Sequence, residues 1–218
     1  TGSGLVYSLD GGSFQSGTTF TGIANGSHTI TVSNSAGCIS TGASFAVSCG
    51  CTGGPTLALG SLSGSTCGTT PISVSGNTFT NANIVTLTED GAGSVTPGST
   101  GSLSFNFTYT PASGDAGNTV RITITTDNPL GTPCTEAVAT YTLTVNNIPS
   151  TPSIGAVTQP TCADGTGRVV LSGLPSTGTW TINPGAITGA GSSTTITGLN
   201  PGTYNFTVTS SASCTSSV

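Results

Sequence analysis

The chain has 218 residues, only 4% of them are charged, and its formal net charge at pH 7 is −5. Two arginines without any lysine cannot form the clustered basic surface that nucleic acids require, and no apolar run reaches the ~20 residues of a membrane-spanning helix. Nucleic-acid binding and membrane insertion are therefore excluded. Abundant β-branched residues and scarce helix formers predict an all-β fold of tandem sandwiches without a significant helix.

Residues 1–50 are predicted to be the C-terminal part of a β-sandwich repeat. Leu5–Asp10 has the alternation of a strand, and the glycines that follow supply the positive φ of a tight turn. Residues 22–38 then contain a turn, a second alternating strand that includes His28, and a terminal Cys38. The opening strands of such a repeat have no counterpart here, so we interpret the chain as a fragment of a longer array.

Residues 53–147 predict an immunoglobulin-like β-sandwich. Six alternating segments are separated by turns rich in Gly, Pro, Asn and Asp, which is typical of such sandwiches. The clearest strand has an apolar face formed by Leu103, Phe105, Phe107 and Tyr109. Asp115-Ala116-Gly117 resembles the corner before a late sandwich strand, although the tyrosine of a tyrosine corner is absent.

Residues 150–218 repeat the pattern of the first segment, and we expect a β-sandwich repeat that lacks its last strand. Seven residues recur at one constant spacing, with Gly22, Gly26, Thr31, Val32, Ser35, Ala36 and Cys38 matched by Gly198, Gly202, Thr207, Val208, Ser211, Ala212 and Cys214. Tyr204, Phe206 and Val208 are predicted to form the apolar face of a strand. Trp180 is predicted to match Tyr7 as a core residue, in preference to a sugar-stacking platform.

The seven cysteines predict an oxidising, extracellular setting with structural disulfides. Cys162 and Cys214 flank the strands of the third segment, and Cys67 and Cys134 flank those of the middle segment, so we expect each of these two pairs to form a disulfide. Three cysteines stay unassigned, namely Cys38, Cys49 and Cys51. Cys49 or Cys51 could pair locally with Cys38 or with a cysteine outside this fragment.

No residue pattern indicates catalysis, and we expect neither an enzyme nor a cofactor. A Ser-His-Asp arrangement needs a histidine beside a nucleophile, whereas the only histidine, His28, is expected to be a half-buried strand residue. Turn carboxylates can bind Ca²⁺, and Glu89 and Asp90 are the candidates, although the sequence has no D-x-D-x-D-G loop. Cys49-Gly50-Cys51 is one residue short of the zinc-type C-x-x-C spacing.

Both ends of the chain carry motifs that resemble one family. Val157-Thr158-Gln159-Pro160-Thr161-Cys162 and the later Pro201-Gly202-Thr203-Tyr204 resemble the SprB-like repeats of giant surface adhesins in Bacteroidota, and Tyr7-Ser8-Leu9-Asp10-Gly11-Gly12 looks like a variant of the same repeat. The resemblance covers residues 1–48 and 150–218, while the middle segment is similar only to generic immunoglobulin-like spacers. It implies export by the type IX secretion system and a role in adhesion, gliding or extracellular fibres.

Two functional hypotheses follow. In the first, the chain is a structural and adhesive repeat segment of a long extracellular surface or filament protein. Its partners would then be neighbouring repeats, other copies in a fibre and surface glycans. In the second, it is a carbohydrate-binding module of a secreted multidomain protein.

Overall fold

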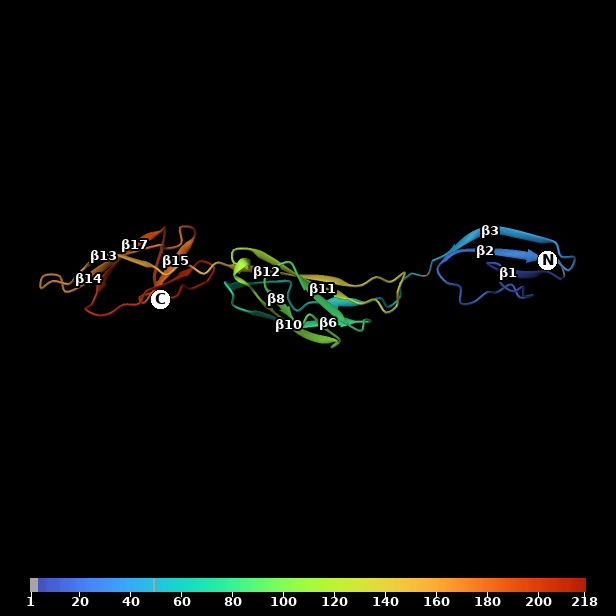
Figure 1. Ribbon diagram of the computed structural model, residues 1–218, viewed down its shortest axis with the longest axis horizontal. Coiled ribbons are helices and arrows are strands. Elements are labelled where there is room, and N and C mark those ends of the chain that lie inside the picture. Colours follow the sequence, from blue (N-terminus) through green and yellow to red (C-terminus); the bar gives the residue numbers. More distant parts are fainter. Residues whose placement is uncertain (1–3, 49) are drawn as a thin grey trace. The chain divides into compact units, whose positions relative to one another are not determined.

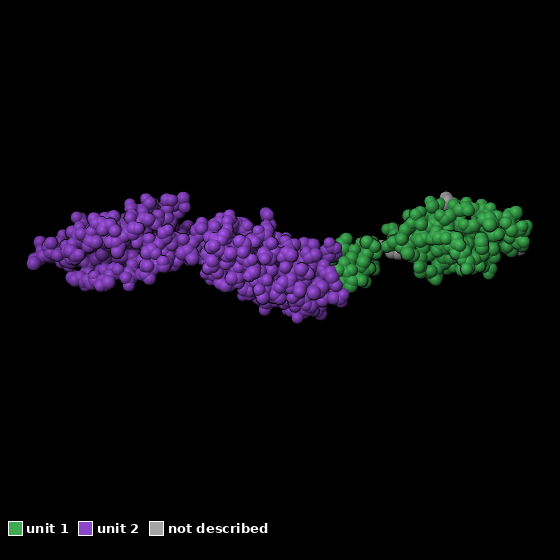
Figure 2. All heavy atoms as spheres, in the orientation of Figure 1, with its two compact units in different colours: residues 1–55, 128–135 green, residues 56–127, 136–218 purple. Residues whose placement is uncertain are grey.

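The computed structural model describes residues 4–48 and 50–218 and is an all-β protein (Figure 1). The chain divides into two compact units (Figure 2), of which unit 1 contains residues 1–55 and 128–135, and unit 2 contains residues 56–127 and 136–218. Helical structure among the described residues amounts to one 3₁₀ turn, η1 (Ser113–Asp115). None of the described segments forms a helix of the length and apolarity needed to cross a bilayer.

Unit 1 contains one antiparallel sheet of three strands in the order β1-β2-β3. The strands are β1 (Val6–Leu9), β2 (Gly26–Ser33) and β3 (Ile39–Val47). The tight turn predicted after β1 is present, because Asp10 and Gly11 have φ values of 51° and 74° and the Gly12 N–H donates to the Leu9 carbonyl at 2.9 Å. A second hairpin joins β2 to β3 and pairs Ser33 with Ile39.

The first part of unit 2 consists of two sheets. One has the order β4-β6-β10-β8, with β4 (Thr56–Ala58), β6 (Ile72–Thr80), β10 (Ser104–Thr110) and β8 (Ser94–Thr96). The other has the order β5-β12-β11-β7-β9, with β5 (Ser63–Cys67), β12 (Val138–Asn146), β11 (Thr119–Thr126), β7 (Val85–Glu89) and β9 (Ser99–Thr100). The apolar faces of both sheets contribute to one buried core.

The alternation of β10 explains that core. Phe105, Phe107 and Tyr109 are buried, as their period-2 spacing predicts, and the residues between them are more exposed. Leu103 precedes the strand and is 61% exposed, so its predicted place on the apolar face is wrong. Buried apolar area contributes roughly 25 cal/mol per Å², which makes these aromatic side chains the main stabilising groups of the strand.

The second part of unit 2 also has two sheets. One has the order β13-β14-β17, with β13 (Ser153–Thr158), β14 (Gly167–Ser172) and β17 (Ser193–Leu199). The other has the order β16-β15-β18, with β16 (Ile187–Ala190), β15 (Thr179–Asn183) and β18 (Thr207–Ser210). Trp180 is 3% exposed in their shared core, and its indole N–H donates to the Gly191 carbonyl at 2.8 Å. The prediction that Trp180 is a core residue is confirmed.

The predicted equivalence of Tyr7 and Trp180 is wrong by two residues. Tyr7 lies opposite Val32, and the residue opposite the matching Val208 is Ile182. Trp180 lies opposite Ser210 instead. A shift of two residues keeps a side chain on the same face of a strand, so the alternation of the sequence could not distinguish the two registers.

Both disulfides differ from the predicted pairs. The structure joins Cys51 to Cys134, with Cα atoms 4.8 Å apart, and Cys67 to Cys214, with Cα atoms 5.6 Å apart. Cys162 is therefore not bonded to Cys214, and Cys67 is not bonded to Cys134. The prediction assumed that each sandwich closes on itself, but a disulfide requires Cα atoms about 4.4–6.8 Å apart, which depends on which turns approach one another. The disulfide of Cys67 and Cys214 instead joins the two parts of unit 2.

Cys162 and the three cysteines that the sequence left unassigned have different states. Cys38 and Cys162 are exposed free thiols. Cys51 pairs with a cysteine of the loop between β11 and β12, which neither alternative for its partner included. Cys49 lies outside the described residues.

Candidate functional site

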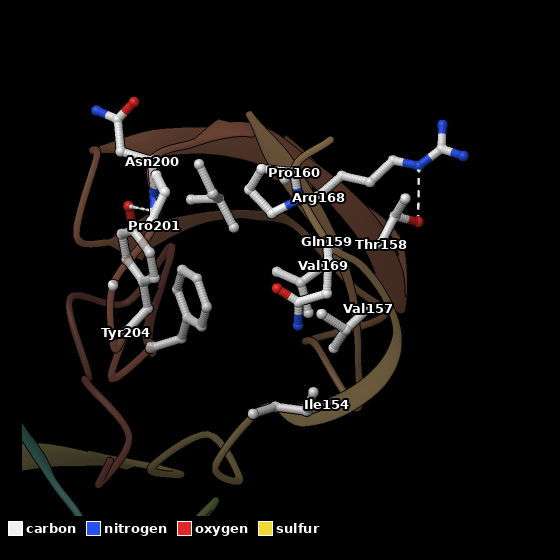
Figure 3. Close-up of a pocket in the computed structure, with 14 residues that line it drawn as sticks. Ile154, Val157, Thr158, Gln159, Pro160, Arg168, Val169, Asn200, Pro201 and Tyr204 are labelled. Carbon is white, nitrogen blue, oxygen red and sulfur yellow. Dashed lines mark hydrogen bonds between the residues drawn. The ribbon is translucent and has the colours of Figure 1, made fainter. Parts of the chain in front are cut away.

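A groove lies in the second part of unit 2, between β13 with the residues that follow it and the segment before β18 (Figure 3). Its cavity has a volume of about 170 Å³. We call it the Tyr204 groove and define it by six apolar side chains, those of Ile154, Val157, Pro160, Pro201, Tyr204 and Phe206. It is the candidate binding site because it combines a concave shape with several large apolar side chains and a few polar groups.

Local sequence positions the aromatic wall of the groove. The chain changes direction at the Asn200-Pro201-Gly202 turn. The Tyr204 hydroxyl then donates a hydrogen bond to the Asn200 carbonyl at 2.9 Å. The rings of Tyr204 and Phe206 are stacked, with centroids 5.9 Å apart and an interplanar angle of 8°. The predicted strand is only partly present, because β18 begins at Thr207 and residues 203–206 lie outside any strand.

The opposite wall is β13, whose six residues are all exposed. Ile154 is 64% exposed and Val157 is 54% exposed, which is unusual for large aliphatic side chains in one short strand. The amide of Gln159 extends into the cavity, and the Arg168 side chain points away from it, where its Nε donates to Thr158 Oγ1 at 3.1 Å (Figure 3). The groove thus combines apolar side chains with the polar amide of Gln159.

His28 is held by two acceptors in unit 1. Its Nδ1 donates to Asp10 Oδ2 at 2.7 Å and its Nε2 donates to the Ala24 carbonyl at 2.8 Å, an arrangement that suits the doubly protonated ring. The hydrogen bond to Asp10 raises the pKa of His28, and the same hydrogen bond lowers the pKa of Asp10, which also accepts the Thr29 N–H. Because both ring nitrogens are engaged, His28 has no free nitrogen to act as a base toward a nucleophile.

Tyr109 and Asp115 form a buried anchor that the sequence did not reveal. The Tyr109 hydroxyl donates to Asp115 Oδ2 at 2.8 Å, and the carboxylate also accepts the N–H groups of Ala92 and Ala112. Burial opposes ionisation of Asp115, but these hydrogen bonds together hold its pKa below the usual value. Burial raises the pKa of Tyr109 to about 12. The anchor takes its tyrosine from β10, outside the strand in which the tyrosine-corner pattern would place it.

The other turn carboxylates also accept backbone N–H groups. Asp90 Oδ1 accepts the Arg121 N–H at 2.7 Å, and Asp127 Oδ1 accepts the N–H groups of Asn83 and Ile84. Within residues 4–48 and 50–218, no group of three or more His, Cys, Asp or Glu side chains could hold a metal ion. Glu89 and Asp90 therefore do not belong to such a cluster. A Ca²⁺ ion takes 6–8 oxygen ligands, which is more than these two side chains can supply.

Comparisons with known proteins identify no family for this chain. The chain matches no protein-family model and no curated protein. It is similar to the fibronectin(III)-like modules of CbhA from Clostridium thermocellum, with 12% identity over 66% of this chain and 77% of that chain and a TM-score of 0.34. It is also similar to the FN1–FN3 domains of chicken CNTN1, with 12% identity over 88% of this chain and 72% of that chain and a TM-score of 0.36.

A third similar structure contains immunoglobulin domains 1–4 of Sidekick-1, with 13% identity over 97% of this chain and 64% of that chain and a TM-score of 0.35. The TM-scores of these three matches are all below 0.5, so the description of this chain as an all-β protein rests on its own strands and sheets.

Proposed function

We propose that this chain is a structural and adhesive repeat segment of a long extracellular surface or filament protein. It acts as a spacer between neighbouring repeats and as a module for cell-surface adhesion or fibre formation. Its role is not enzymatic. Its partners are adjacent repeats and other copies of the protein, and its resemblance to SprB-like repeats points to a Bacteroidota adhesin exported by the type IX system.

The observation that carries this proposal is the disulfide between Cys67 and Cys214. Cys67 ends β5 in the first part of unit 2, and Cys214 follows β18 in the second part, so the bond crosses from one β-sandwich to the next. A covalent crosslink between consecutive modules suits a protein that must keep its modules together outside the cell, where disulfides persist.

The use of the polar groups supports the same role. The carboxylates of Asp90, Asp115 and Asp127 accept hydrogen bonds from the backbone at turns. These groups hold the fold together and are not directed at a common reacting atom. A surface with so few charges also has little like-charge repulsion between copies, which favours lateral association.

Immunogold electron microscopy of intact cells tests the proposal. An antibody raised against the 218-residue chain should label the outer surface or extracellular filaments, and preincubation with the purified chain should abolish that label. Label that appears only after permeabilisation would contradict the extracellular role.

The alternative function, a carbohydrate-binding module, loses its main candidate platform because the Trp180 ring is buried. Accessible aromatic surface is left at the half-buried Tyr7 and Tyr204 and at the exposed Phe14 and Phe45. A glycan array separates the two functions. We expect no specific binding, and tight binding to one glycan that Tyr204→Ala abolishes would favour the alternative.

A further inference from the structure

The single histidine of the chain contacts both ends of one loop in unit 1. His28 lies on β2, Asp10 lies in the turn after β1, and Ala24 lies just before β2. Nδ1 of the ring is 2.7 Å from Asp10 Oδ2, and Nε2 is 2.8 Å from the Ala24 carbonyl oxygen. The His28 side chain is 12% exposed. It therefore joins the beginning and the end of the loop at residues 10–25.

These two hydrogen bonds need two protons on the ring. A neutral imidazole has one N–H, and its other nitrogen is an acceptor. Both atoms that face the ring of His28 are oxygen acceptors. In the neutral ring, a nitrogen lone pair would therefore face an oxygen at 2.7 or 2.8 Å, which is repulsive. Both bonds can exist together only while the ring is a cation.

The bond to Ala24 is the one that a neutral ring gives up. Asp10 is a carboxylate, which is a stronger acceptor than a peptide carbonyl. Its position is also fixed, because Asp10 Oδ1 accepts the Thr29 N–H at 2.8 Å and the Asp10 N–H donates to the Thr29 carbonyl at 2.9 Å. The remaining proton therefore stays on Nδ1 of His28, and the lone pair of Nε2 then faces the Ala24 carbonyl.

The first half of the loop is held independently of His28. Gln15 exchanges two backbone hydrogen bonds with Tyr7 of β1, at 2.7 and 2.8 Å. The side-chain amide of Gln15 donates to the carbonyls of Gly17 and Thr19. These bonds contain no group that titrates near neutral pH, so residues 11–19 should keep their place when His28 loses a proton.

The second half of the loop depends on the histidine. Among the described residues, His28 is the only one that hydrogen bonds with residues 20–24. Phe20 and Ile23 in this stretch are half-buried. Loss of the bond from His28 therefore removes the one polar contact that holds residues 20–24 in place.

Asp10 is the charged group that faces His28. Tyr7 shares the same face of the sheet but lies opposite Val32, farther along β2. β3 contributes the Phe45 ring, whose centroid is 6.0 Å from that of His28, and an aromatic ring at this distance favours a cation. The sequences of β3 and of the loop contain no ionisable side chain besides Asp10. The charge of His28 is therefore controlled by Asp10, and their hydrogen bond raises the pKa of His28.

We propose that His28 is a pH-dependent latch for residues 20–24. The latch is closed while the ring is doubly protonated, and it opens when the ring loses a proton, which makes Phe20 and Ile23 accessible. Because the pKa of His28 is raised, the latch is fully closed below the ordinary value of about 6.5 and opens as the pH rises through the higher folded value. This inference does not depend on the proposed function, because it concerns only the loop of unit 1.

NMR of the 218-residue chain at a series of pH values tests the proposal. Carbon-13 relaxation is suitable because exchange of amide protons with water does not affect it. The backbone order parameter of Ile23 should fall from about 0.85 to below about 0.6 as the pH rises, with the same midpoint as the titration of His28. The order parameter of Thr19, in the first half of the loop, should not change. An unchanged order parameter of Ile23 while His28 titrates would overturn the proposal.

Two variants separate the latch from a general loosening of unit 1. Asp10→Asn removes the charge beside His28, so the midpoint for Ile23 and the pKa of His28 should move down together toward about 6.5. Glu136→Gln is the matched control, because this carboxylate lies outside unit 1, and it should move neither value. His28→Phe removes both donors and should leave Ile23 mobile at every pH. A midpoint for Ile23 that stays in place while the pKa of His28 moves would contradict the latch, as would a rigid Ile23 in His28→Phe.

Discussion

The hydroxyl of Tyr109 donates a 2.8 Å hydrogen bond to Asp115, and both residues are buried, with exposed fractions of 0% and 3%. The bond joins the end of β10 to the 3₁₀ turn that precedes β11. It therefore couples the two sheets in the first part of unit 2 through a polar contact beneath their apolar core.

Removal of this hydroxyl should destabilise unit 2. Tyr109→Phe leaves the buried carboxylate with one donor fewer, which should lower the free energy of unfolding by about 1–3 kcal/mol. Urea unfolding followed by circular dichroism measures the change. Tyr204→Phe is the matched control, because the hydroxyl of Tyr204 bonds to the Asn200 carbonyl in an exposed position. Equal losses in the two variants would contradict the importance of the anchor.

Acid should weaken unit 2 through Asp115. Its pKa is lowered in the folded chain, so the unfolded chain takes up the proton at higher pH. The stabilisation is present above the unfolded pKa of about 3.9 and is lost as the pH falls through the lower folded value. Urea midpoints between pH 2 and pH 7 measure this loss. The slope should be smaller in Asp115→Asn, and an identical slope in that variant would assign the acid sensitivity to other groups.

The hydrogen bond between His28 and Asp10 should make the stability of unit 1 decrease both at high pH and in acid. The raised pKa of His28 means that its contribution is complete below about pH 6.5 and is lost as the pH rises through the folded value. The lowered pKa of Asp10 means that its contribution is lost in acid. NMR titration of the single histidine should give a pKa above 6.5, and Asp10→Asn should return it toward that value. An unshifted pKa in the parent chain would show that the pair does not form.

Peptide mapping under non-reducing conditions should recover Cys51 joined to Cys134 and Cys67 joined to Cys214. In the loop-entropy model, a bridge between residues 147 positions apart stabilises by roughly 5 kcal/mol, so Cys67→Ser with Cys214→Ser should lower the thermal midpoint. Cys38→Ser is the control, because that thiol is exposed and free. A peptide that contains Cys162 joined to Cys214 would refute the observed pairing.

Gly189 should not accept a side chain. A Cβ atom at this position would overlap the ring of Trp180, which lies opposite it in the sheet. Gly189→Ala should therefore cost about 1–3 kcal/mol, measured by urea unfolding with the fluorescence of the single tryptophan as the signal. Gly165→Ala is the control, since no atom lies within 4 Å of the Cβ position there. A larger loss at Gly165 than at Gly189 would contradict this packing.

Local alternation predicted much of the fold. Phe105, Phe107 and Tyr109 are buried because a period of two places them on one face, and this information lies within a few consecutive residues. The strand expected from Tyr204 onward is shorter than its sequence predicts, because a strand also needs a neighbour, and residues 203–206 have none among the described strands.

The contacts between distant segments could not be predicted in this way. The pairing of Cys67 with Cys214 depends on which turns of consecutive sandwiches meet, and the flanking of strands by cysteines contains no such information. The partner of Asp115 was missed for a related reason. The corner Asp115-Ala116-Gly117 can be recognised in the sequence. The tyrosine that binds it, however, comes from the preceding strand β10 and not from the position that the tyrosine-corner pattern specifies.

The two disulfides also overlap along the sequence, since Cys67 lies between Cys51 and Cys134, and Cys134 lies between Cys67 and Cys214. In a chain pulled from its two ends, tension would therefore pass from Cys51 along the backbone to Cys67 and then across the bond between Cys67 and Cys214, while the longer segments between the crosslinks stayed slack. The polypeptide between Cys51 and Cys214 could not be drawn out to its full contour length, even if every strand within it unfolded. Its extensibility under load is thus limited by covalent bonds, and reduction of those bonds would release the stored length.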